Sequence, residues 1–267
     1  MAAADTNAGF RHALNAEWTK LRTEAGNLWM LLGTILLTVG IGAGVAGTTK
    51  CPSAGCGQDA AKLSLTGVMA GQVVVALVAV LMVGNEYSTG MIRTTFTTMP
   101  RRTEVLAAKA AVLSAVTAAA GLLSVLGSVL VGKLVLPGNG FTARNGYAAL
   151  FGDGATLLRV VAGTVFYLVL IALLGLGIAT AVRSSAGAIG IVLALLFVFP
   201  ILIHVVSSPT WQRHLNQIAP MSAGLGVQTT LDVAKLPIGP WQGLGVVALW
   251  AAAALAIGGT LLRTRDA

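Results

Sequence analysis

Six apolar stretches constrain what this chain can fold into, because each is long enough to cross a lipid bilayer as a helix. A helix needs about 20 mostly apolar residues to span the hydrocarbon core. The stretches that qualify lie at about 27–47, 63–84, 105–131, 157–182, 186–206 and 241–262. Hydrophobic residues make up 56% of the chain and charged residues only 10%, far from the composition of soluble domains. The sequence therefore predicts an all-α, polytopic membrane protein that forms one transmembrane domain over residues 1–267.

The charges between the spans predict how the chain is oriented. An even number of spans places both termini on one side, and positively charged residues favour the cytoplasmic side. With the termini in the cytoplasm, ten of the 17 Lys and Arg residues lie there: Arg11, Lys20, Arg22, Arg93, Arg101, Arg102, Lys109, Arg183, Arg263 and Arg265. We therefore expect cytoplasmic termini and a location in the cell membrane. Because the charges are scattered between spans, the net charge of +8 does not indicate a nucleic-acid partner.

Both cysteines of the chain, Cys51 and Cys56, lie in the first loop predicted outside the cell. An oxidising exterior would allow them to form a small disulfide ring. A metal pair is the alternative, but no histidine or further cysteine lies nearby in the sequence. The disulfide is therefore the favoured prediction.

Residues 10–24, before the first span, are predicted to form an interfacial helix. Its apolar residues recur at helical spacing: Phe10, Leu14, Trp18 and Leu21. Polar and charged residues occupy the other faces: Arg11, Asn15, Glu17, Lys20 and Arg22. Helices of this kind lie in the membrane interface with the apolar face in contact with lipid. We expect membrane lipids to be the partner of this segment.

Residues 86–102, between the second and third spans, contain a second predicted helix. Ile92, Phe96 and Met99 fall on one helical face, and Pro100 ends the pattern. Ser88 or Thr89 is the expected N-cap. The apolar face can dock into a groove of a protein partner or lie on the lipid surface, and the pattern alone leaves both open.

Motifs for nucleotide, metal or catalytic chemistry are not completed in this sequence. Residues 127–133 reproduce the glycines and lysine of a phosphate-binding loop, but Leu134 replaces the required Ser or Thr, and the segment is an apolar helix end. His12, His204 and His214 form no HExxH-type pair. We therefore expect no catalytic residue, no metal site and no cofactor bound by this chain.

The predicted spans also contain no Asp or Glu. Lys109 and Arg159 lie close enough to helix ends to extend their charges into the interface. Carriers driven by an ion gradient usually keep ionisable groups inside the membrane. An ion-coupled carrier is therefore disfavoured, and any pumping would draw its energy from a partner.

Small and uncharged polar residues inside the spans leave two interpretations open. Gly40 with Gly44, and Gly67 with Gly71, form GxxxG pairs that pack helices within one subunit or between two. Polar side chains in the spans could line a pathway or form interhelical hydrogen bonds; they are Thr34, Thr38, Gln72, Ser114, Thr117, Ser124 and Ser128.

Two short motifs resemble a known family. Residues 86–93 read EYSTGMIR, followed by Pro100-Arg101-Arg102 and by Lys109, and residues 16–22 read AEWTKLR. With the six spans, these motifs resemble the membrane subunit of an ABC-2 type exporter, especially its actinobacterial members. The resemblance implies a separate cytoplasmic ATPase dimer that binds ATP and Mg²⁺, and a second permease that is either another copy or a related chain. It also implies a coupling helix between spans two and three, with candidate coupling residues Glu86, Tyr87, Gly90, Ile92, Arg93, Phe96, Met99, Arg101 and Arg102.

For two residues of the first motif, Glu86 and Gly90, we expect a particular environment. A carboxylate at the inner end of a span is costly unless it is paired, so Glu86 should have a cationic partner, either Arg93 or Lys109. Gly90 would permit a tight turn or a close backbone approach.

The function expected from these features is export of a hydrophobic or amphipathic compound, such as a drug, an antibiotic or a lipid-like molecule. ATP hydrolysis on another chain would drive it, so this chain is expected to be a transporter subunit and not an enzyme. The choice of export over import rests on the resemblance. A non-transporting membrane sensor or scaffold is the alternative, and an ion-coupled secondary carrier is a weaker one.

Overall fold

The computed structural model describes residues 2–53, 56–91, 102–147 and 150–264. Within these ranges the chain is helical and contains no strand, and six helices are long and apolar enough to cross a membrane. This confirms the predicted all-α polytopic fold. The six helices are α2 (Ala25–Thr48), α4 (Val68–Ser88), α6 (Arg102–Val135), α7 (Gly154–Val182), α8 (Ser185–Val205) and α11 (Pro240–Thr264).

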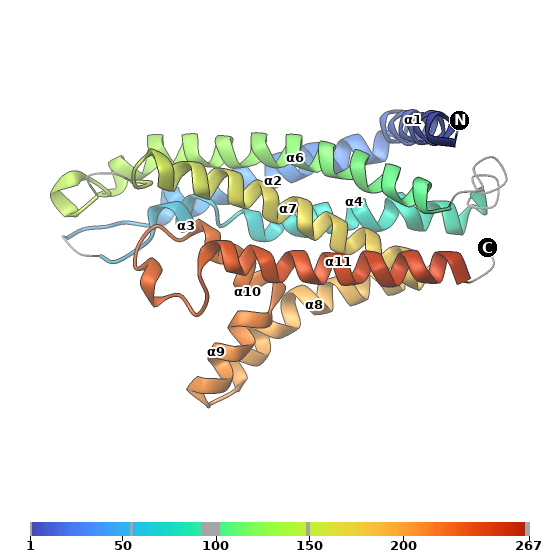
Figure 1. Ribbon diagram of the computed structural model, residues 1–267. Coiled ribbons are helices and arrows are strands. Elements are labelled where there is room, and N and C mark those ends of the chain that lie inside the picture. The colour runs from blue at the N-terminus through green and yellow to red at the C-terminus, as the bar shows by residue number, and fades with distance from the viewer. Residues whose placement is uncertain (1, 54–55, 92–101, 148–149, 265–267) are drawn as a thin grey trace.

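The helices lie side by side in an elongated bundle, with α7 at its centre (Figure 1). Helix α7 packs against α4, α6, α8 and α11, and its buried residues include Tyr167, Leu168, Ile171 and Leu174. Both termini lie at one end of the bundle, here called the termini end (Figure 1). The opposite end carries the loops with Cys51 and Cys56 and is called the disulfide end.

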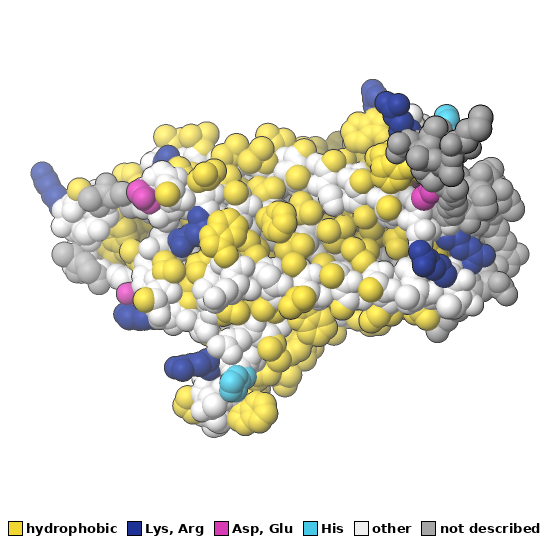
Figure 2. Space-filling model, in the orientation of Figure 1, with side chains coloured by type: hydrophobic (Ala, Val, Ile, Leu, Met, Phe, Trp, Pro, Cys, Tyr) yellow, Lys and Arg dark blue, Asp and Glu magenta, His cyan; other side chains and the backbone are white. Residues whose placement is uncertain are grey.

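The surface of the bundle is that of a membrane protein. Figure 2 shows hydrophobic side chains along the length of the visible face, while Lys, Arg, Asp and Glu gather toward the two ends. Large apolar side chains such as Trp29, Leu130 and Leu249 are 59–72% exposed in the isolated chain. In water such exposure would be unfavourable, whereas in a bilayer these side chains contact lipid.

The predicted second span differs from the structure, whereas the turn between the fourth and fifth spans agrees with it. The predicted second span, 63–84, is divided into α3 (Ala60–Ser64) and α4, and α4 extends through the motif to Ser88. Ser88 and Thr89 therefore end α4, where both hydroxyls donate to the carbonyl oxygen of Asn85. The helix that one of them is predicted to cap lies outside the described residues. Between α7 and α8 the chain turns within two residues, with Arg183 in a left-handed conformation (φ 59°).

The two GxxxG pairs have different surroundings. A Cβ on Gly67 would collide with the carbonyl oxygen of Thr38 in α2, and one on Gly71 would collide with the Thr38 hydroxyl. This pair therefore packs α4 against α2 within the subunit. A Cβ on Gly40 or Gly44 would meet nothing within 4 Å.

Most of the polar residues in the spans are buried between helices. Six of the seven are buried, namely Thr34, Thr38, Gln72, Thr117, Ser124 and Ser128, and Ser114 is half-buried. Two of their hydroxyls donate to carbonyl oxygens of the same helix, Thr34 to Met30 at 3.0 Å and Ser124 to Ala120 at 2.7 Å. Hydrogen bonding inside the subunit accounts for these two hydroxyls.

The disulfide end is built from short helices and loops that are tied together. Cys51 and Cys56 are joined by a disulfide. The long segment before α11 contains α9 (Pro209–Ile218) and α10 (Pro220–Leu225), and the 3-10 turns Gly226–Gln228 and Val233–Lys235. Further 3-10 turns lie at Leu136–Asn139 and Ala143–Asn145. Helix α8 diverges from the bundle and α9 packs back along it, so the two form a projecting hairpin (Figure 1).

Asp59 connects two distant segments of the disulfide end. Its carboxylate caps α3 by accepting from Ala61 N and Lys62 N at 3.0 and 3.3 Å. It also accepts from Thr230 N, Thr230 Oγ1 and Leu231 N at 2.6, 2.8 and 3.0 Å, across 171 residues or more of sequence. One charged side chain therefore holds the loop before α11 against α3.

Replacing Asp59 with asparagine is expected to loosen this connection. The neutral amide has one acceptor oxygen in place of two, so some of the five donors lose their partner. We expect a loss of about 2 kcal/mol of stability, which corresponds to roughly 4–8 °C in the thermal unfolding midpoint of the detergent-solubilised protein. Asp232→Asn is the control, because among the described residues the Asp232 carboxylate pairs with the exposed Lys235 of the same turn. Equal midpoints for the two variants would contradict the role given to Asp59.

Candidate functional site

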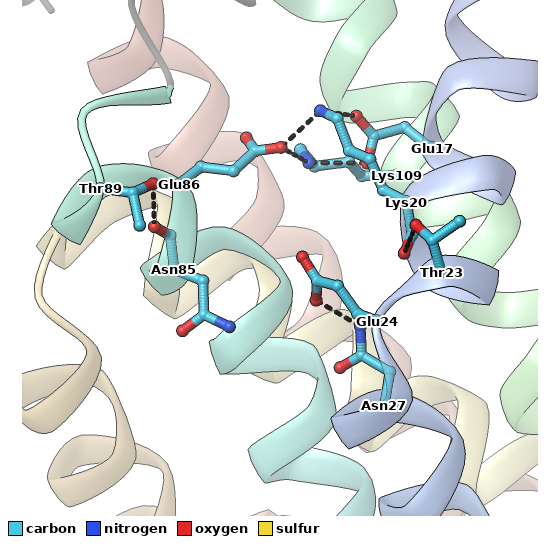
Figure 3. A network of polar contacts seen from close by, with 9 residues as sticks. All are labelled: Glu17, Lys20, Thr23, Glu24, Asn27, Asn85, Glu86, Thr89 and Lys109. Atoms are coloured by element: carbon cyan, nitrogen blue, oxygen red, sulfur yellow. Dashed lines mark hydrogen bonds and ion pairs between the residues drawn. The ribbon is translucent and has the colours of Figure 1, made fainter.

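Four charged side chains from three helices meet at the termini end. Glu17 and Lys20 lie on α1 (Ala2–Thr23), Glu86 lies in the last turn of α4, and Lys109 lies two turns into α6. Lys109 Nζ is 2.7 Å from Glu17 Oε2 and 2.8 Å from Glu86 Oε1. Lys20 Nζ is 2.6 Å from Glu86 Oε1 and 3.0 Å from Glu17 Oε1. Each lysine thus bridges both carboxylates, and Figure 3 shows the four side chains pointing toward one another. We call these four residues the charge network.

The charge network is almost entirely removed from water. Glu17, Glu86 and Lys109 are only 2–4% exposed, and the side chain of Lys20 is 30% exposed. Charges at this depth are strongly unfavourable unless they are paired and hydrogen-bonded. The network satisfies that condition with two formal negative and two formal positive charges.

The pKa of Lys20 reflects this balance. Burial by itself would lower the pKa of this lysine. The hydrogen bond to Glu86 and the charges of Glu17 and Glu86 act in the opposite direction and outweigh burial, so the pKa lies above its ordinary value. Lys20 is therefore held in its cationic form by the two carboxylates.

The placement of Glu17 depends on which face α1 turns toward the bundle. Ala13, Glu17 and Leu21 follow one another at intervals of four residues and are all 2–3% exposed. Trp18, predicted to share an apolar face with Leu21, is 46% exposed. The predicted face of Phe10, Leu14, Trp18 and Leu21 is therefore divided, since Leu21 packs in the core while Trp18 points outward.

Further contacts connect the start of α6 and the end of α7 with the end of α11, beside the charge network. Arg102, at the start of α6, donates from Nη1 to the carbonyl oxygen of Leu262 at 2.9 Å. Arg183, between α7 and α8, donates to the carbonyl oxygen of Leu261 at 3.4 Å, and its guanidinium lies 5.6 Å from the centre of the Tyr87 ring. Cations are favourable at the C-terminus of a helix, where carbonyl groups lack partners. These contacts hold the last turn of α11 against α6 and α7.

The structure can be compared with the predicted coupling residues one by one. Glu86 is paired with Lys109, one of its two predicted partners, and also with Lys20. Gly90 adopts φ 71° in a turn just after α4, as expected for a tight turn. Tyr87 contacts Arg183, and Arg102 contacts α11. The remaining predicted residues lie outside the described part of the chain: Ile92, Arg93, Phe96, Met99 and Arg101.

Of the two cations expected to extend from helix ends into the interface, Lys109 needs correction. Lys109 does not extend to the interface but is buried at 3% exposure, because two carboxylates receive its ammonium group inside the bundle. Arg159 is only partly buried and donates from Nη2 to the carbonyl oxygen of Thr229 at 2.6 Å. Of the acceptors, Glu86 was a predicted partner of Lys109, whereas Glu17 and the Thr229 carbonyl oxygen were not predicted.

Metal chemistry finds no support among the side chains that the structure describes. In this part of the chain no group of three or more His, Cys, Asp and Glu residues is arranged to hold a metal ion. The network carboxylates are instead occupied by lysines. The arrangement suits a mechanical connection between helices.

The fold and the network together define a multi-pass membrane protein whose charged groups are concentrated where the helices end. Comparison with protein-family models assigns residues 13–201 to a family described as ABC-2 family transporter protein. The match covers most of the chain and includes all four residues of the charge network. The chain therefore belongs to the ABC-2 transporter family and is the permease subunit of an ABC transporter. A comparison with curated proteins finds no match.

Proposed function

We propose that this permease exports a hydrophobic or amphipathic compound and that a separate ATPase dimer, which binds ATP and Mg²⁺, supplies the energy. The assembly would contain a second permease, either another copy or a related chain. The family assignment supports the transporter class. The observation that supports the mechanism is the buried charge network, because it joins α1, α4 and α6 at the end of α4, which segment 92–101 follows in the sequence.

In this proposal the termini end lies in the cytoplasm and the disulfide end outside the cell. The excess of Lys and Arg on the side of the termini supports this orientation. The disulfide between Cys51 and Cys56 supports it as well, since disulfides persist in oxidising surroundings.

The charge network gives a physical route for the motion. Glu86 lies four residues before the turn at Gly90, so a partner that displaces the following segment also pulls on the end of α4. Glu86 cannot move alone without separating from Lys20 on α1 and Lys109 on α6. Separating buried charges is strongly unfavourable. The ends of α1, α4 and α6 are therefore expected to move together when the ATPase closes.

The coupling can be tested with the ATPase encoded nearest to this gene. Permease and ATPase should co-purify, and the complex in proteoliposomes should move a fluorescent lipophilic dye when ATP is present. Arg93→Glu and Phe96→Asp should each lower transport per ATP hydrolysed about tenfold, the scale of a typical coupling free energy, while membrane insertion stays normal. Lys235→Glu is the control, because it reverses one charge at the disulfide end.

The outcomes separate the candidate functions. A complex that hydrolyses ATP without moving any compound would favour a membrane scaffold or sensor. Transport that persists without the ATPase and stops when the ion gradient collapses would favour a secondary carrier. Failure of the two chains to associate, together with no stimulation of ATP hydrolysis in the bilayer, would overturn the proposal.

A further inference from the structure

Helix α1 lies across the axis of the bundle at the termini end. Figure 1 shows α1 nearly end-on, whereas the long helices α6 and α11 run along the bundle. The chain changes direction at Glu24, whose backbone is extended (ψ 98°) between α1 and α2 and whose carboxylate accepts from the Asn27 amide at 2.8 Å. A helix in this direction at the end of a transmembrane bundle lies parallel to the membrane surface, where interfacial helices are found.

The side chains that α1 offers to lipid differ from the predicted apolar stripe. Ala13, Glu17 and Leu21 are buried, and Glu17 pairs with Lys109 of α6. Leu14, a member of the predicted stripe, packs against the core of the bundle together with Leu21. Part of the apolar surface of α1 is therefore spent on the protein, and another face meets the membrane.

The face of α1 away from the buried residues combines arginine with tryptophan. Arg11, Asn15, Trp18 and Arg22 follow one another at intervals of three or four residues, so they share one side of the helix. All four are exposed. We call these four residues the outer face of α1.

The charges on the outer face have one sign. Among residues 9–23, all of which the structure describes, the exposed Lys, Arg, Asp or Glu side chains are Arg11 and Arg22. Glu17 and Lys20 of the same stretch are engaged in the charge network. The two arginines are about 16 Å apart along the helix, so each can reach an anionic group of its own.

The outer face is continuous with the lipid-facing surface of the bundle. Trp18 on α1 and Trp29 early in α2 are both exposed, and tryptophan is enriched where hydrocarbon meets head groups. Leu32 and Leu36 continue the exposed surface along α2 into the apolar part of the bundle. The arginines therefore lie near the level of the lipid head groups.

We propose that the outer face of α1 binds the head groups of anionic phospholipids through Arg11 and Arg22. Guanidinium groups form charge-assisted, bidentate hydrogen bonds with phosphate. The choline of phosphatidylcholine offsets its phosphate charge, so a lipid with net negative charge is preferred. Bound lipid holds α1 from the membrane side, while the charge network holds it against α4 and α6. The inner leaflet as the source rests on the orientation proposed above, whereas the binding itself does not.

Binding can be measured on the permease alone in neutral detergent at low salt. Protein is titrated into a trace of dansyl-labelled phosphatidylglycerol or phosphatidylcholine, and energy transfer from tryptophan reports the complex. Each arginine near a lipid surface contributes about fivefold in affinity, so phosphatidylglycerol should bind about 25-fold more tightly than phosphatidylcholine. Arg11→Gln and Arg22→Gln should each weaken phosphatidylglycerol binding about fivefold, with phosphatidylcholine binding and the thermal unfolding midpoint unchanged.

The matched control is the double variant Lys133→Gln with Arg144→Gln, which removes two exposed cations from the disulfide end. It should bind phosphatidylglycerol as the unmodified protein does, whereas Arg11→Gln with Arg22→Gln should lose about 25-fold. Equal losses in the two double variants would mean that total charge governs binding, and would overturn the assignment. Equal affinity of the unmodified protein for the two lipids would overturn it as well.

Two competitors distinguish other occupants of the outer face. Glycerol phosphate carries the anionic group without the chains, and it should not displace the labelled lipid at matched concentration; displacement would assign the face to a soluble phosphate compound. Displacement by saturating ATPase would assign the face to that protein, and either result would overturn the proposal. The titration itself contains neither ATP nor ATPase, so its failure leaves ATP-driven transport as proposed. Failure of the coupled transport assay likewise leaves the lipid-binding result standing.

Discussion

Replacing Lys109 with methionine is expected to destabilise the protein strongly. Methionine has a similar length and suits an apolar surrounding, but it leaves Glu17 and Glu86 buried with only Lys20 between them. Removing one partner of a buried ion pair typically costs 3–5 kcal/mol, that is, about 4 kcal/mol here. The thermal unfolding midpoint of the detergent-solubilised protein should fall by roughly 10 °C.

Two further variants show whether the network is the cause. Lys133→Met makes the same change in the same helix at an exposed position of the disulfide end, and it should leave the midpoint within about 1 °C of the unmodified protein. The double variant Lys109→Met with Glu17→Gln removes one charge of each sign, so Glu86 and Lys20 remain a balanced pair. It should recover a substantial part of the loss. If Lys109→Met behaves like Lys133→Met, the network does not stabilise the fold.

The charge network can connect stability with function because it joins three helices, α1, α4 and α6. An apolar contact between helix ends can slide, because burial of apolar surface has no preferred direction. An ion pair at 2.6–2.8 Å has a defined geometry, and its partners in the network come from different helices. This geometry makes the network suited to carrying displacement from the end of α4 to α1 and α6.

Much of the fold could be predicted from the sequence because spanning a bilayer requires long apolar runs. The turn between α7 and α8 agrees with prediction, since Arg183 and Ser184 leave room for a reversal and little else. Glu86 could also be expected to have a cationic partner, because a buried carboxylate needs one. Lys109 could be named as a candidate for this partner because it lies near the same end of the bundle.

The rest of the network could not be predicted, because it depends on how α1 is rotated against the bundle. Apolar periodicity favoured the face of Leu14 and Trp18, but packing uses the stripe of Ala13, Glu17 and Leu21. A stripe with a charged residue at its centre becomes favourable only when Lys109 lies opposite it. The spacing of Ala13, Glu17 and Leu21 is the one signal in the sequence that could have indicated this face.

The contact of Asp59 with Thr230 was unpredictable for a different reason. The two residues are separated by 171 positions and belong to irregular segments, which have no periodic pattern. Their approach follows from the packing of the spans to which those segments are attached. Long-range contacts between loops are therefore a consequence of the fold and not a feature of local sequence.

Gly177→Leu is expected to prevent α7 and α11 from packing. A Cβ on Gly177 would lie 2.5 Å from backbone atoms of Ala254 and Leu255, and a Cβ on Gly258 would lie 2.7 Å from the Gly177 carbonyl oxygen. The two backbones are thus in direct contact, as small residues allow in membrane helices. A leucine must push α11 away from the central helix, and we expect a loss of roughly 3 kcal/mol or more.

The control for this variant separates backbone approach from the general effect of replacing glycine. Gly245 also lies in α11, but a Cβ there would meet nothing within 4 Å. Leucine favours a helix over glycine by nearly 1 kcal/mol, so Gly245→Leu should be neutral or slightly stabilising. Size-exclusion chromatography and thermal unfolding should give a monodisperse, stable Gly245→Leu protein and a poorly folded Gly177→Leu protein. Two variants of equal stability would mean that α11 can leave α7 at little cost, and the central position of α7 would then not hold the bundle together.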